Sequence, residues 1–216
     1  LFHALFKGLL FLSVGTTVDR TGIRNVYRLR GASAILRASG ERFPVTLISF
    51  IAGALAISAV PPFNGFISKN AISYALEGTP LYHFLYAAGI GTAASFIKLS
   101  RIYWPANPGQ AIHSHESPVP LTCRLAEAAL ALMCLAGGLG AASMHSMTVG
   151  LLSGSAGGAA IQWYTASSVL KALLVIILGA GIYALTLTRP VSKVLALIRE
   201  RPGDPRGLYI SFSIGT

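Results

Sequence analysis

The sequence predicts an all-α membrane protein with about five transmembrane helices, the second of them broken at Pro61-Pro62. Charged residues make up only 11% of the 216 residues, against roughly 25% in soluble domains, and 53% of the residues are apolar. The mean hydropathy is +0.64, and the apolar residues gather in long runs separated by charged connections. A chain of this composition needs lipid around it, which argues against a soluble or a disordered domain.

Five apolar segments approach or exceed the roughly 20 residues that a membrane-spanning helix needs. They cover about 1–18, 43–76, 81–104, 121–144 and 168–188. We expect residues 1–104 to form a core, 105–188 to hold two peripheral transmembrane helices, and 189–216 to be a basic cytoplasmic tail. Because the chain opens without Met and already inside an apolar run, we expect it to be the carboxy-terminal piece of a longer protein.

The segment 43–76 is too long to be one straight transmembrane helix. Its 34 residues would measure roughly 50 Å as a helix, against a hydrocarbon core of about 30 Å. Two adjacent prolines remove backbone donors and a glycine follows, so we expect a helix over about 44–59, an unwound patch and a second helix over about 66–76. Interrupted helices mark ion or substrate sites in transporters, and a proline kink used only for packing is the alternative.

The connections between the apolar segments alternate in charge. The connection 19–42 carries six arginines against two acids, whereas the next one carries only Glu77 and 145–167 carries no charged residue. Around the remaining connection, basic residues lie at the adjoining ends of the two flanking segments, namely Lys98, Arg101 and Arg124. Further arginines and a lysine follow the last segment. The positive-inside rule therefore predicts an inner (cytoplasmic) membrane protein whose basic connections and tail face the cytoplasm. At the start of the fourth segment Arg124 and Glu127, spaced i,i+3, are expected to pair.

Four lysines fall inside apolar segments, where a charged side chain is costly and often functional. Lys98 and Lys171 are expected to snorkel to the headgroups, which leaves Lys7 and Lys69 as candidates for function. Lys69 follows the break near the end of its segment, so snorkelling to the interface and a functional role both remain open. Lys7 lies close to mid-bilayer, roughly 16 Å from the cytoplasmic end of its helix, and His3 projects from the same face. Lys and His can hold and pass protons, so we expect a relay, with a structural ion pair to another helix as the alternative.

The sequence gives little support for a disulfide, an enzyme active site, a metal site or nucleic-acid binding. Cys123 and Cys134 would lie roughly 16 Å apart on one helix, which is too far for a disulfide. A phosphate-binding loop, a Cys-x-x-Cys motif and a nucleophile elbow are all absent, so we expect no catalytic residue and no cofactor. His113 and His115 with Glu116 lack a further ligand, so we expect no metal site. Because the charges lie between apolar runs, we also expect no binding to nucleic acid.

Two motifs resemble one known family. The run HALFKGLLFL from His3 to Leu12, followed by Gly15, is similar to the "HAxFKaxLFLxxG" helix of antiporter-like membrane subunits. The run GALAISAVPPFNGFISK, which ends at Lys69, resembles the second broken helix of that family, whose pattern is "GxLAlxGxPPfxGFxSK". The family commonly has Gly where this chain has Ala59. Such subunits occur in respiratory complex I, in membrane-bound hydrogenases and in Mrp-type cation/proton antiporters.

The resemblance implies roles for individual residues. Lys7 would belong to a central hydrophilic axis with His3 as its neighbour, and Lys69 would load or release ions in the outward half-channel. The broken helix would contribute the turn-forming and polar residues of the site, namely Pro61, Pro62, Asn64, Gly65 and Ser68.

The same resemblance predicts a proton- or cation-translocating subunit of a complex I-like NADH:quinone oxidoreductase or of a membrane-bound hydrogenase. Such a subunit would carry out no redox chemistry itself and would assemble with other membrane subunits in the lipid bilayer. A stand-alone Mrp-type sodium/proton antiporter subunit is one alternative, and a proton-coupled solute carrier is another. A purely structural membrane anchor is the third, and it predicts that Lys7 and Lys69 tolerate Leu or Met without loss of function.

Overall fold

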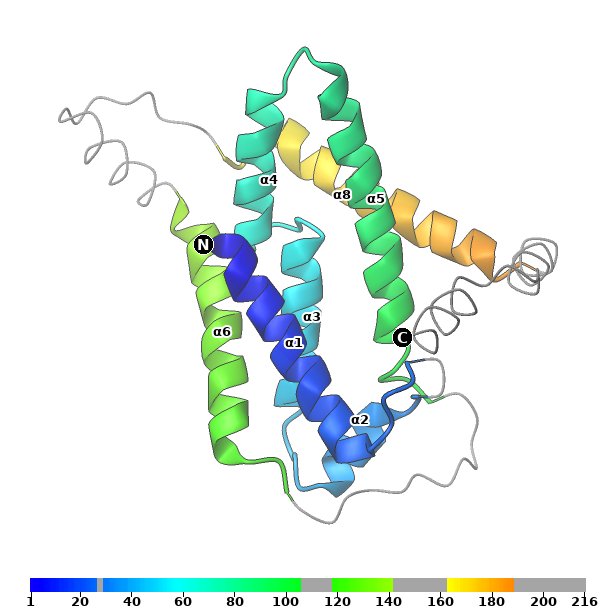
Figure 1. Cartoon of the computed structure of the whole chain (residues 1–216). Coiled ribbons are helices and arrows are strands. Elements are labelled where there is room, and N and C mark those ends of the chain that lie inside the picture. Colours follow the sequence, from blue (N-terminus) through cyan, green and yellow to red (C-terminus); the bar gives the residue numbers. More distant parts are fainter. Residues whose placement is uncertain (27–28, 106–117, 142–162, 189–216) are drawn as a thin grey trace, which may run out of the picture.

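The computed structural model describes residues 1–26, 29–105, 118–141 and 163–188, and every regular element in these ranges is an α-helix (Figure 1). In chain order the helices are α1 (Phe2–Thr21), α2 (Ala32–Ala38), α3 (Val45–Ile57), α4 (Asn64–Ala75), α5 (Pro80–Ser100), α6 (Leu121–Leu139) and α8 (Ala166–Thr186). Each apolar segment of the sequence corresponds to one of these helices or, for 43–76, to the pair α3 and α4. The all-α prediction is therefore confirmed for the described residues.

Some sequence predictions concern residues that the structure does not describe. The possible ligands His113, His115 and Glu116 lie outside the described residues, and so do most of the uncharged connection before α8 and the basic tail 189–216. The short helix α2, in contrast, was not predicted, because its seven residues sit inside an arginine-rich connection that carries no long apolar run.

Among the described residues, two helices, α6 and α8, are long and apolar enough by themselves to cross a membrane. The helix α3 is also apolar, but it has only 13 residues. The helices α1 and α5 have 20 and 21 residues, but hydroxyl-bearing, glycine and charged residues interrupt their apolar runs. The predicted number of five spans is therefore not confirmed.

The helix α1 is central to one bundle, because it packs against both α3 and α6, and these two also pack against each other. The helix α4 continues this bundle along α6, whereas α5 lies beside α3 and makes its most extensive contact with α8, which runs obliquely behind it (Figure 1). One buried apolar cluster joins Phe50 on α3, Leu36 on α2 and Tyr103 after α5. A second joins Phe6 on α1 to Cys134 on α6.

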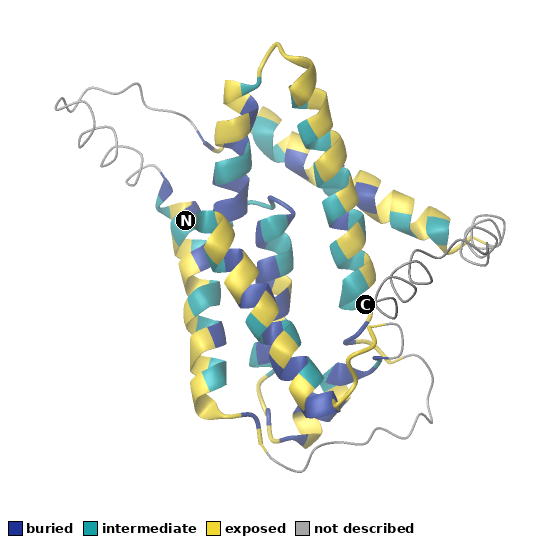
Figure 2. Cartoon of the chain, in the orientation of Figure 1, coloured by how far each residue is buried: buried dark blue, intermediate teal, exposed yellow. Residues whose placement is uncertain are grey.

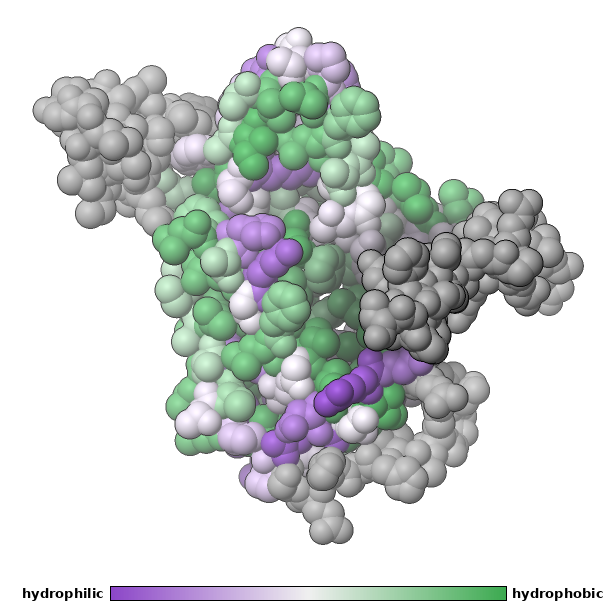
Figure 3. Space-filling model, in the orientation of Figure 1, coloured by the Kyte–Doolittle hydropathy of each residue, from purple (hydrophilic) through white to green (hydrophobic). Residues whose placement is uncertain are grey.

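The outward faces of the helices remain apolar and exposed (Figure 2). Phe11 on α1 is 77% exposed, and Ile177 on α8 is 69% exposed. In Figure 3 the hydrophobic surface covers much of the visible bundle, while hydrophilic residues gather mainly toward its lower end. Exposed apolar faces of this extent are expected where lipid or neighbouring proteins cover the molecule.

The two arginine-containing connections described in the structure meet at one end of the bundle. The start of α2 is tied to the segment after α5, because the Gly31 amide donates to the Trp104 carbonyl and the Ala32 amide donates to the Ile102 carbonyl, both at 3.0 Å. The Ser33 hydroxyl donates to the Tyr103 carbonyl at 2.7 Å. We call this the basic end, defined by residues 19–26, 29–44 and 101–105 together with the start of α6. The turn between α4 and α5 lies at the opposite end (Figure 1).

Candidate functional site

The predicted break in the second apolar segment is present: α3 ends at Ile57, and α4 begins at Asn64. The chain turns through a Schellman motif, in which the Val60 amide donates to the Leu55 carbonyl at 2.9 Å and the Ala59 amide donates to the Ala56 carbonyl at 3.0 Å. These bonds satisfy carbonyl groups that the end of a helix would otherwise leave unpaired. Ala59 has φ of 59°, in the left-handed region where this motif usually has glycine.

Glycines allow the two sides of the break to pack closely. A Cβ atom at Gly65 would overlap the Ala56 carbonyl of α3, and a Cβ atom at Gly138 of α6 would overlap the Pro62 carbonyl. The Tyr164 hydroxyl closes the same region by donating to the Gly138 carbonyl at 2.7 Å. Partial burial raises the pKa of Tyr164. The break is thus built from backbone groups of three elements in direct contact.

Two polar residues of the predicted broken-helix site lie in the first two turns of α4. The Ser68 hydroxyl donates to the Gly65 and Asn64 carbonyls at 3.2 and 3.3 Å. Asn64 is fully buried, and both polar atoms of its side chain lack a hydrogen-bond partner. A buried amide without partners is costly, and such groups in native structures commonly mark a site for water, a ligand or a change of conformation.

Lys69 projects from α4 towards α5. Its Nζ atom lies 4.9 Å from the centre of the Tyr86 ring, within the range of a cation–π interaction. Gly89, one turn further along α5, leaves space for the ammonium group, because a Cβ atom there would lie 2.5 Å from Lys69 Nζ. The half-buried Lys69 is therefore held between two helices, and the sequence did not indicate either partner.

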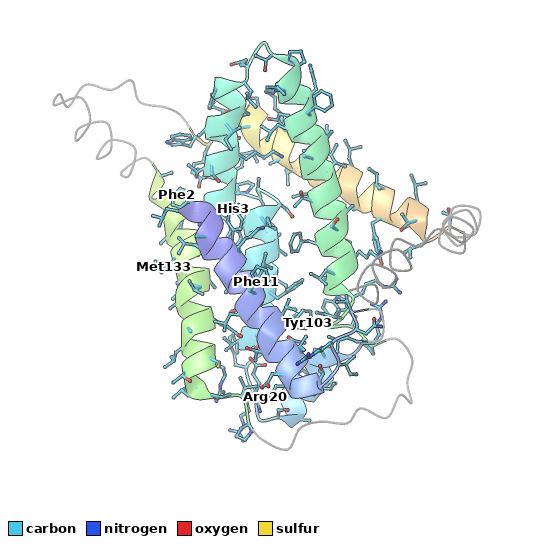
Figure 4. The ribbon with its side chains drawn as sticks, viewed as in Figure 1. Phe2, His3, Phe11, Arg20, Tyr103 and Met133 are labelled. Atoms are coloured by element: carbon cyan, nitrogen blue, oxygen red, sulfur yellow. The ribbon has the colours of Figure 1, made fainter. Side chains whose placement is uncertain are left out.

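Lys7 and His3 lie on the exposed side of α1, one turn apart. His3 lies near the start of α1, and its ring packs edge-on against Phe6 with 5.0 Å between ring centres (Figure 4). Lys7 lines a cavity of about 700 Å³. The opposite wall of this cavity comes from α5 and includes the hydroxyl-bearing residues Thr92 and Ser95. Lys69 is not among the residues that line it.

A second cavity of about 560 Å³ continues along the same side of α1. Phe11 and Val14 line both cavities, and Asp19 and Arg24 line the far part of the second. Together the two cavities form a groove, which we call the α1 groove, that runs from Lys7 to the basic end. The structure therefore brings Lys7 and His3 to one helix face beside a groove, and it places Lys69 in a separate environment between α4 and α5.

Comparison with known proteins places these features in a family. Residues 1–97 match the family described as "NADH:quinone oxidoreductase/Mrp antiporter, TM", and these residues include Lys7, the break and Lys69. Residues 1–97 belong to the antiporter-like membrane subunit family. The chain is therefore part of a multi-pass membrane protein, as its composition predicted.

Individual relatives of the antiporter-like family match over different lengths. Hydrogenase-4 component B of Escherichia coli K12 is 33% identical over 147 residues, which cover 62% of this chain and 21% of that protein. Formate hydrogenlyase subunit 3 of the same organism is 29% identical over 152 residues, covering 64% and 24%. One Na(+)/H(+) antiporter subunit of Bacillus subtilis 168 is 40% identical over 68 residues, covering 32% and 8%. The chain thus spans at most about a quarter of the length of these relatives.

The structure also reveals a buried polar cluster at the basic end that sequence reasoning missed. Glu127 on α6 is fully buried, and its Oε1 atom accepts a hydrogen bond from the Thr16 hydroxyl at 2.7 Å. Glu41, between α2 and α3, is 1% exposed, and its Oε1 atom accepts from the Thr46 amide at 2.7 Å. The expected pairing of Glu127 with Arg124 is not formed, because Thr16 across the helix interface is the partner of the carboxyl group.

The hydroxyl groups of α1 extend the cluster. Thr17 and Tyr103 share a hydrogen bond of 3.0 Å, and both side chains are fully buried. Figure 4 shows Tyr103 toward the end of α1 that carries Arg20, away from His3. One signal in the sequence could have found this cluster. Ser13, Thr16 and Thr17 share a face of the first helix, which indicates a polar partner packed against it.

Proposed function

We propose that the chain is part of a proton- or cation-translocating subunit of a complex I-like NADH:quinone oxidoreductase or of a membrane-bound hydrogenase. In this proposal Lys7, His3 and Lys69 carry the ion through the membrane, and redox energy arrives from neighbouring subunits. The chain itself needs no cofactor for such a role. The relatives called hydrogenase-4 component B and formate hydrogenlyase subunit 3 support this choice of complexes.

The position of Lys69 is the observation that carries the proposal. It lies one turn after a helix break in a membrane family, and the aromatic ring of Tyr86 contacts its ammonium group. A cation at membrane depth is costly unless a neighbouring group or water compensates it. Unwound backbone at such depth is tolerated where it lines protein or a wet cavity, which is the setting of ion sites in transporters.

Lys7 supplies the second part of the proposed pathway. Its α1 groove contains Thr92 and Ser95 opposite the ammonium group and ends near Asp19 and Arg24. A groove of this kind can hold the water that a titrating lysine needs in order to exchange protons. His3 extends the same helix face, and the imidazole titrates in the physiological range when it is unperturbed.

The proposal assigns the basic end to the cytoplasm of an inner membrane. The meeting of the arginine-rich connection 19–42 with the segment that starts at Arg101 supports this orientation, because positive charge is enriched on the cytoplasmic side. The turn beside Glu77 would then face outward, with Lys69 nearer to that side.

The test is Lys7→Ala in the full-length protein, assembled with its partner subunits and reconstituted in lipid vesicles. We expect redox-driven proton translocation to fall by about 100-fold, at the low end for loss of a proton-transferring group. Lys98→Ala, an exposed lysine near the basic end of α5, is the matched control and should leave translocation unchanged. Undiminished translocation by a normally assembled Lys7→Ala protein would contradict the relay.

A stand-alone Mrp-type sodium/proton antiporter subunit is the second candidate. The observation that favours it is the 40% identity to the Na(+)/H(+) antiporter subunit of Bacillus subtilis over 68 residues. Vesicles that contain the full-length protein without redox partners distinguish the two functions. Sodium-dependent proton efflux in such vesicles supports the antiporter, whereas its absence together with redox-driven pumping supports the first proposal.

A further inference from the structure

Polar side chains continue beyond Lys69 toward the end of the bundle that lies opposite the basic end. The Tyr86 ring, which contacts the Lys69 ammonium group, packs against the Tyr82 ring one turn earlier on α5, with 4.9 Å between the ring centres. The two tyrosine hydroxyls are hydrogen-bond partners, and Lys171 Nζ donates to the Tyr82 hydroxyl at 3.0 Å. We call Tyr86, Tyr82 and Lys171 the tyrosine row. It connects the half-buried Lys69 with an exposed lysine on α8.

Three helices hold the tyrosine row in place (Figure 1). Tyr82 and Tyr86 lie in the first two turns of α5, and Lys171 lies in the second turn of α8. Ala172, the neighbour of Lys171, is buried in an apolar cluster with Phe66 of α4. The start of α8 is therefore packed against α4 as well as against α5, and Lys171 Nζ lies over the Tyr82 ring, 5.7 Å from its centre.

Two donors meet at the hydroxyl oxygen of Tyr82. An ammonium group can only donate, so this oxygen accepts from Lys171. The Tyr86 hydroxyl supplies a second hydrogen bond. A cation and a hydroxyl that both donate to one phenol oxygen favour its phenolate form over the neutral phenol. Tyr82 is therefore better placed than an ordinary surface tyrosine to give up its proton.

The side of Tyr82 that faces away from Lys69 is open. Glu77 in the turn before α5, Tyr74 on α4 and His83 on α5 are all exposed. The His83 ring packs edge-on against Tyr82, with 5.6 Å between the ring centres. Tyr82 is itself partly exposed. A proton that leaves the Tyr82 hydroxyl therefore reaches water at this end of the bundle.

The inner end of the tyrosine row lies beside Lys69. Lys69 and Ser73 are four residues apart on α4 and therefore share a face of that helix. Ser73 is a further hydrogen-bond partner of the Tyr86 hydroxyl. The Lys69 ammonium group ends a flexible side chain and lies over the Tyr86 ring. A small rotation of that side chain, or one water molecule, places the ammonium within hydrogen-bond reach of the Tyr86 hydroxyl.

We propose that Tyr82 releases the proton of Lys69 at this end of the bundle, with Tyr86 as the group between them. Lys171 is a positioning residue, because it does not carry the proton but stabilises the Tyr82 phenolate. Tyr82 gives its hydroxyl proton to water, Tyr86 gives its own proton to the phenolate, and the Lys69 ammonium gives one to Tyr86 and becomes a neutral amine. One proton leaves Lys69, both phenols are restored, and nothing is oxidised or reduced. Because every step moves a proton between oxygen or nitrogen atoms, the ion that leaves by this route is a proton and not sodium.

The experiment measures redox-driven proton translocation by the full-length protein, assembled with its partner subunits in lipid vesicles. We expect Tyr82→Phe and Tyr86→Phe each to lower the rate about 10-fold, since both keep the ring and remove the hydroxyl that passes the proton. Tyr86→Phe preserves the aromatic ring beside the Lys69 ammonium, so a lost cation–π interaction does not account for its effect. Tyr183→Phe, at a partly exposed tyrosine in the last turn of α8, is the control and should leave the rate unchanged.

Substitutions of Lys171 separate its positioning role from a merely structural one. Lys171→Arg keeps a cation that donates to Tyr82 and should retain the wild-type rate, whereas Lys171→Gln removes the charge and should lower the rate several-fold. The phenolate is less stable in Lys171→Gln, so the rate should reach its maximum at a higher pH on the releasing side. An unchanged rate and pH profile in Lys171→Gln, or an equal loss in Lys171→Arg, would overturn the role of Lys171.

Tyr82 has this role only if Lys69 carries protons, so the release route rests on the proposed function, and the two fail in different ways. A wild-type protein without redox-driven translocation contradicts the proposed function and the route with it. Translocation that stops in Lys7→Ala but continues undiminished in Tyr82→Phe or Tyr86→Phe overturns the route alone. Assembly with the partner subunits is checked for each variant. Because Lys171 is exposed, its two variants keep the test decisive if a tyrosine variant does not assemble.

Discussion

Lys7 and Lys69 occupy opposite kinds of surroundings. Lys69 lies between α4 and α5, where Tyr86 and the space at Gly89 accommodate its ammonium group. Lys7 lies on an exposed face of α1, and the α1 groove beside it is open. The region around Lys69 therefore has partners within the described residues, whereas the described residues leave the Lys7 side chain exposed beside a groove. The packing of the chain thus constrains Lys69 more tightly than Lys7.

The largest expected effect comes from a substitution at the break between α3 and α4, close to the region around Lys69. Gly65→Ala places a methyl group on the Ala56 carbonyl, a backbone atom that cannot move without reshaping the break. We expect a loss of about 3 kcal/mol or more in the free energy of unfolding, at the upper end for overpacking. Thermal unfolding in detergent, followed by circular dichroism, measures the change.

The matched control for this prediction is Gly8→Ala on the open side of α1. A Cβ atom there has no heavy atom within 4 Å. The variant should be neutral or should gain up to about 1 kcal/mol from helix propensity. Equal destabilisation by both substitutions would mean that the two regions do not differ as the comparison states.

A second prediction concerns the position of the Lys69 ammonium group. Gly89→Ala places a methyl group where Lys69 Nζ now lies, and the flexible end of the lysine must leave the Tyr86 ring. The cation–π interaction, about 1 kcal/mol for a partly exposed pair, is lost, and we expect translocation by the full-length protein to fall several-fold. Reconstituted vesicles measure the rate.

Gly91→Ala tests whether that effect is specific to Lys69. Gly91 lies on the same helix, and a Cβ atom there has no heavy atom within 4 Å. Both substitutions add a methyl group to α5, but the one at Gly91 lies at the wall of the α1 groove, whereas only the one at Gly89 displaces the Lys69 ammonium group. A rate that falls equally in the two variants would attribute the loss to α5 itself and not to the ammonium position.

The sequence predicted the parts of the fold that local chemistry determines. Two prolines followed by a glycine interrupt a helix wherever they occur, so the break between α3 and α4 could be placed to within a few residues. The seven-residue helix α2 has no long apolar run and gains its stability from contacts with the segment after α5, which only the folded chain provides.

The site was less predictable because its partners are distant in the sequence. Lys7 and Lys69 stood out as charges in apolar segments, but nothing local pointed from Lys69 to Tyr86 or from Glu127 to Thr16. The nearest local partner of Glu127, Arg124, suggested an i,i+3 pair that does not form. Packing of α1 against α6 decided that contact, and helix packing is a property of the whole bundle.

A third prediction concerns the strain stored in the break. Ala59 sits at φ of 59°, a conformation that costs roughly 1–2 kcal/mol for a residue with a Cβ atom. Ala59→Gly removes this cost but also removes a buried methyl group, since Ala59 is 4% exposed. We expect a net gain of about 0.5–1 kcal/mol in unfolding free energy. A decrease in the melting temperature would show that packing of the methyl group outweighs the relief of strain.

The smallest expected effect concerns the Tyr164 hydroxyl, which links α6 to the region of the break. Tyr164→Phe removes the 2.7 Å bond to the Gly138 carbonyl, and we expect a loss of about 0.5 kcal/mol because the side chain is partly exposed. Tyr74→Phe, at another exposed tyrosine, should change stability less.

The stability that the Tyr164 hydroxyl contributes should decrease at high pH. Partial burial raises the pKa of Tyr164 in the folded protein. The neutral phenol therefore contributes its stability in full below the unfolded value of about 10 and loses it as the pH rises through the folded value. At neutral pH the wild type should be more stable than Tyr164→Phe, and this advantage should shrink or reverse as the pH rises through that range, because burial disfavours the phenolate. A difference that grows with pH would mean that the ionised phenolate, and not the donated hydrogen bond, stabilises the junction of α6 with the break.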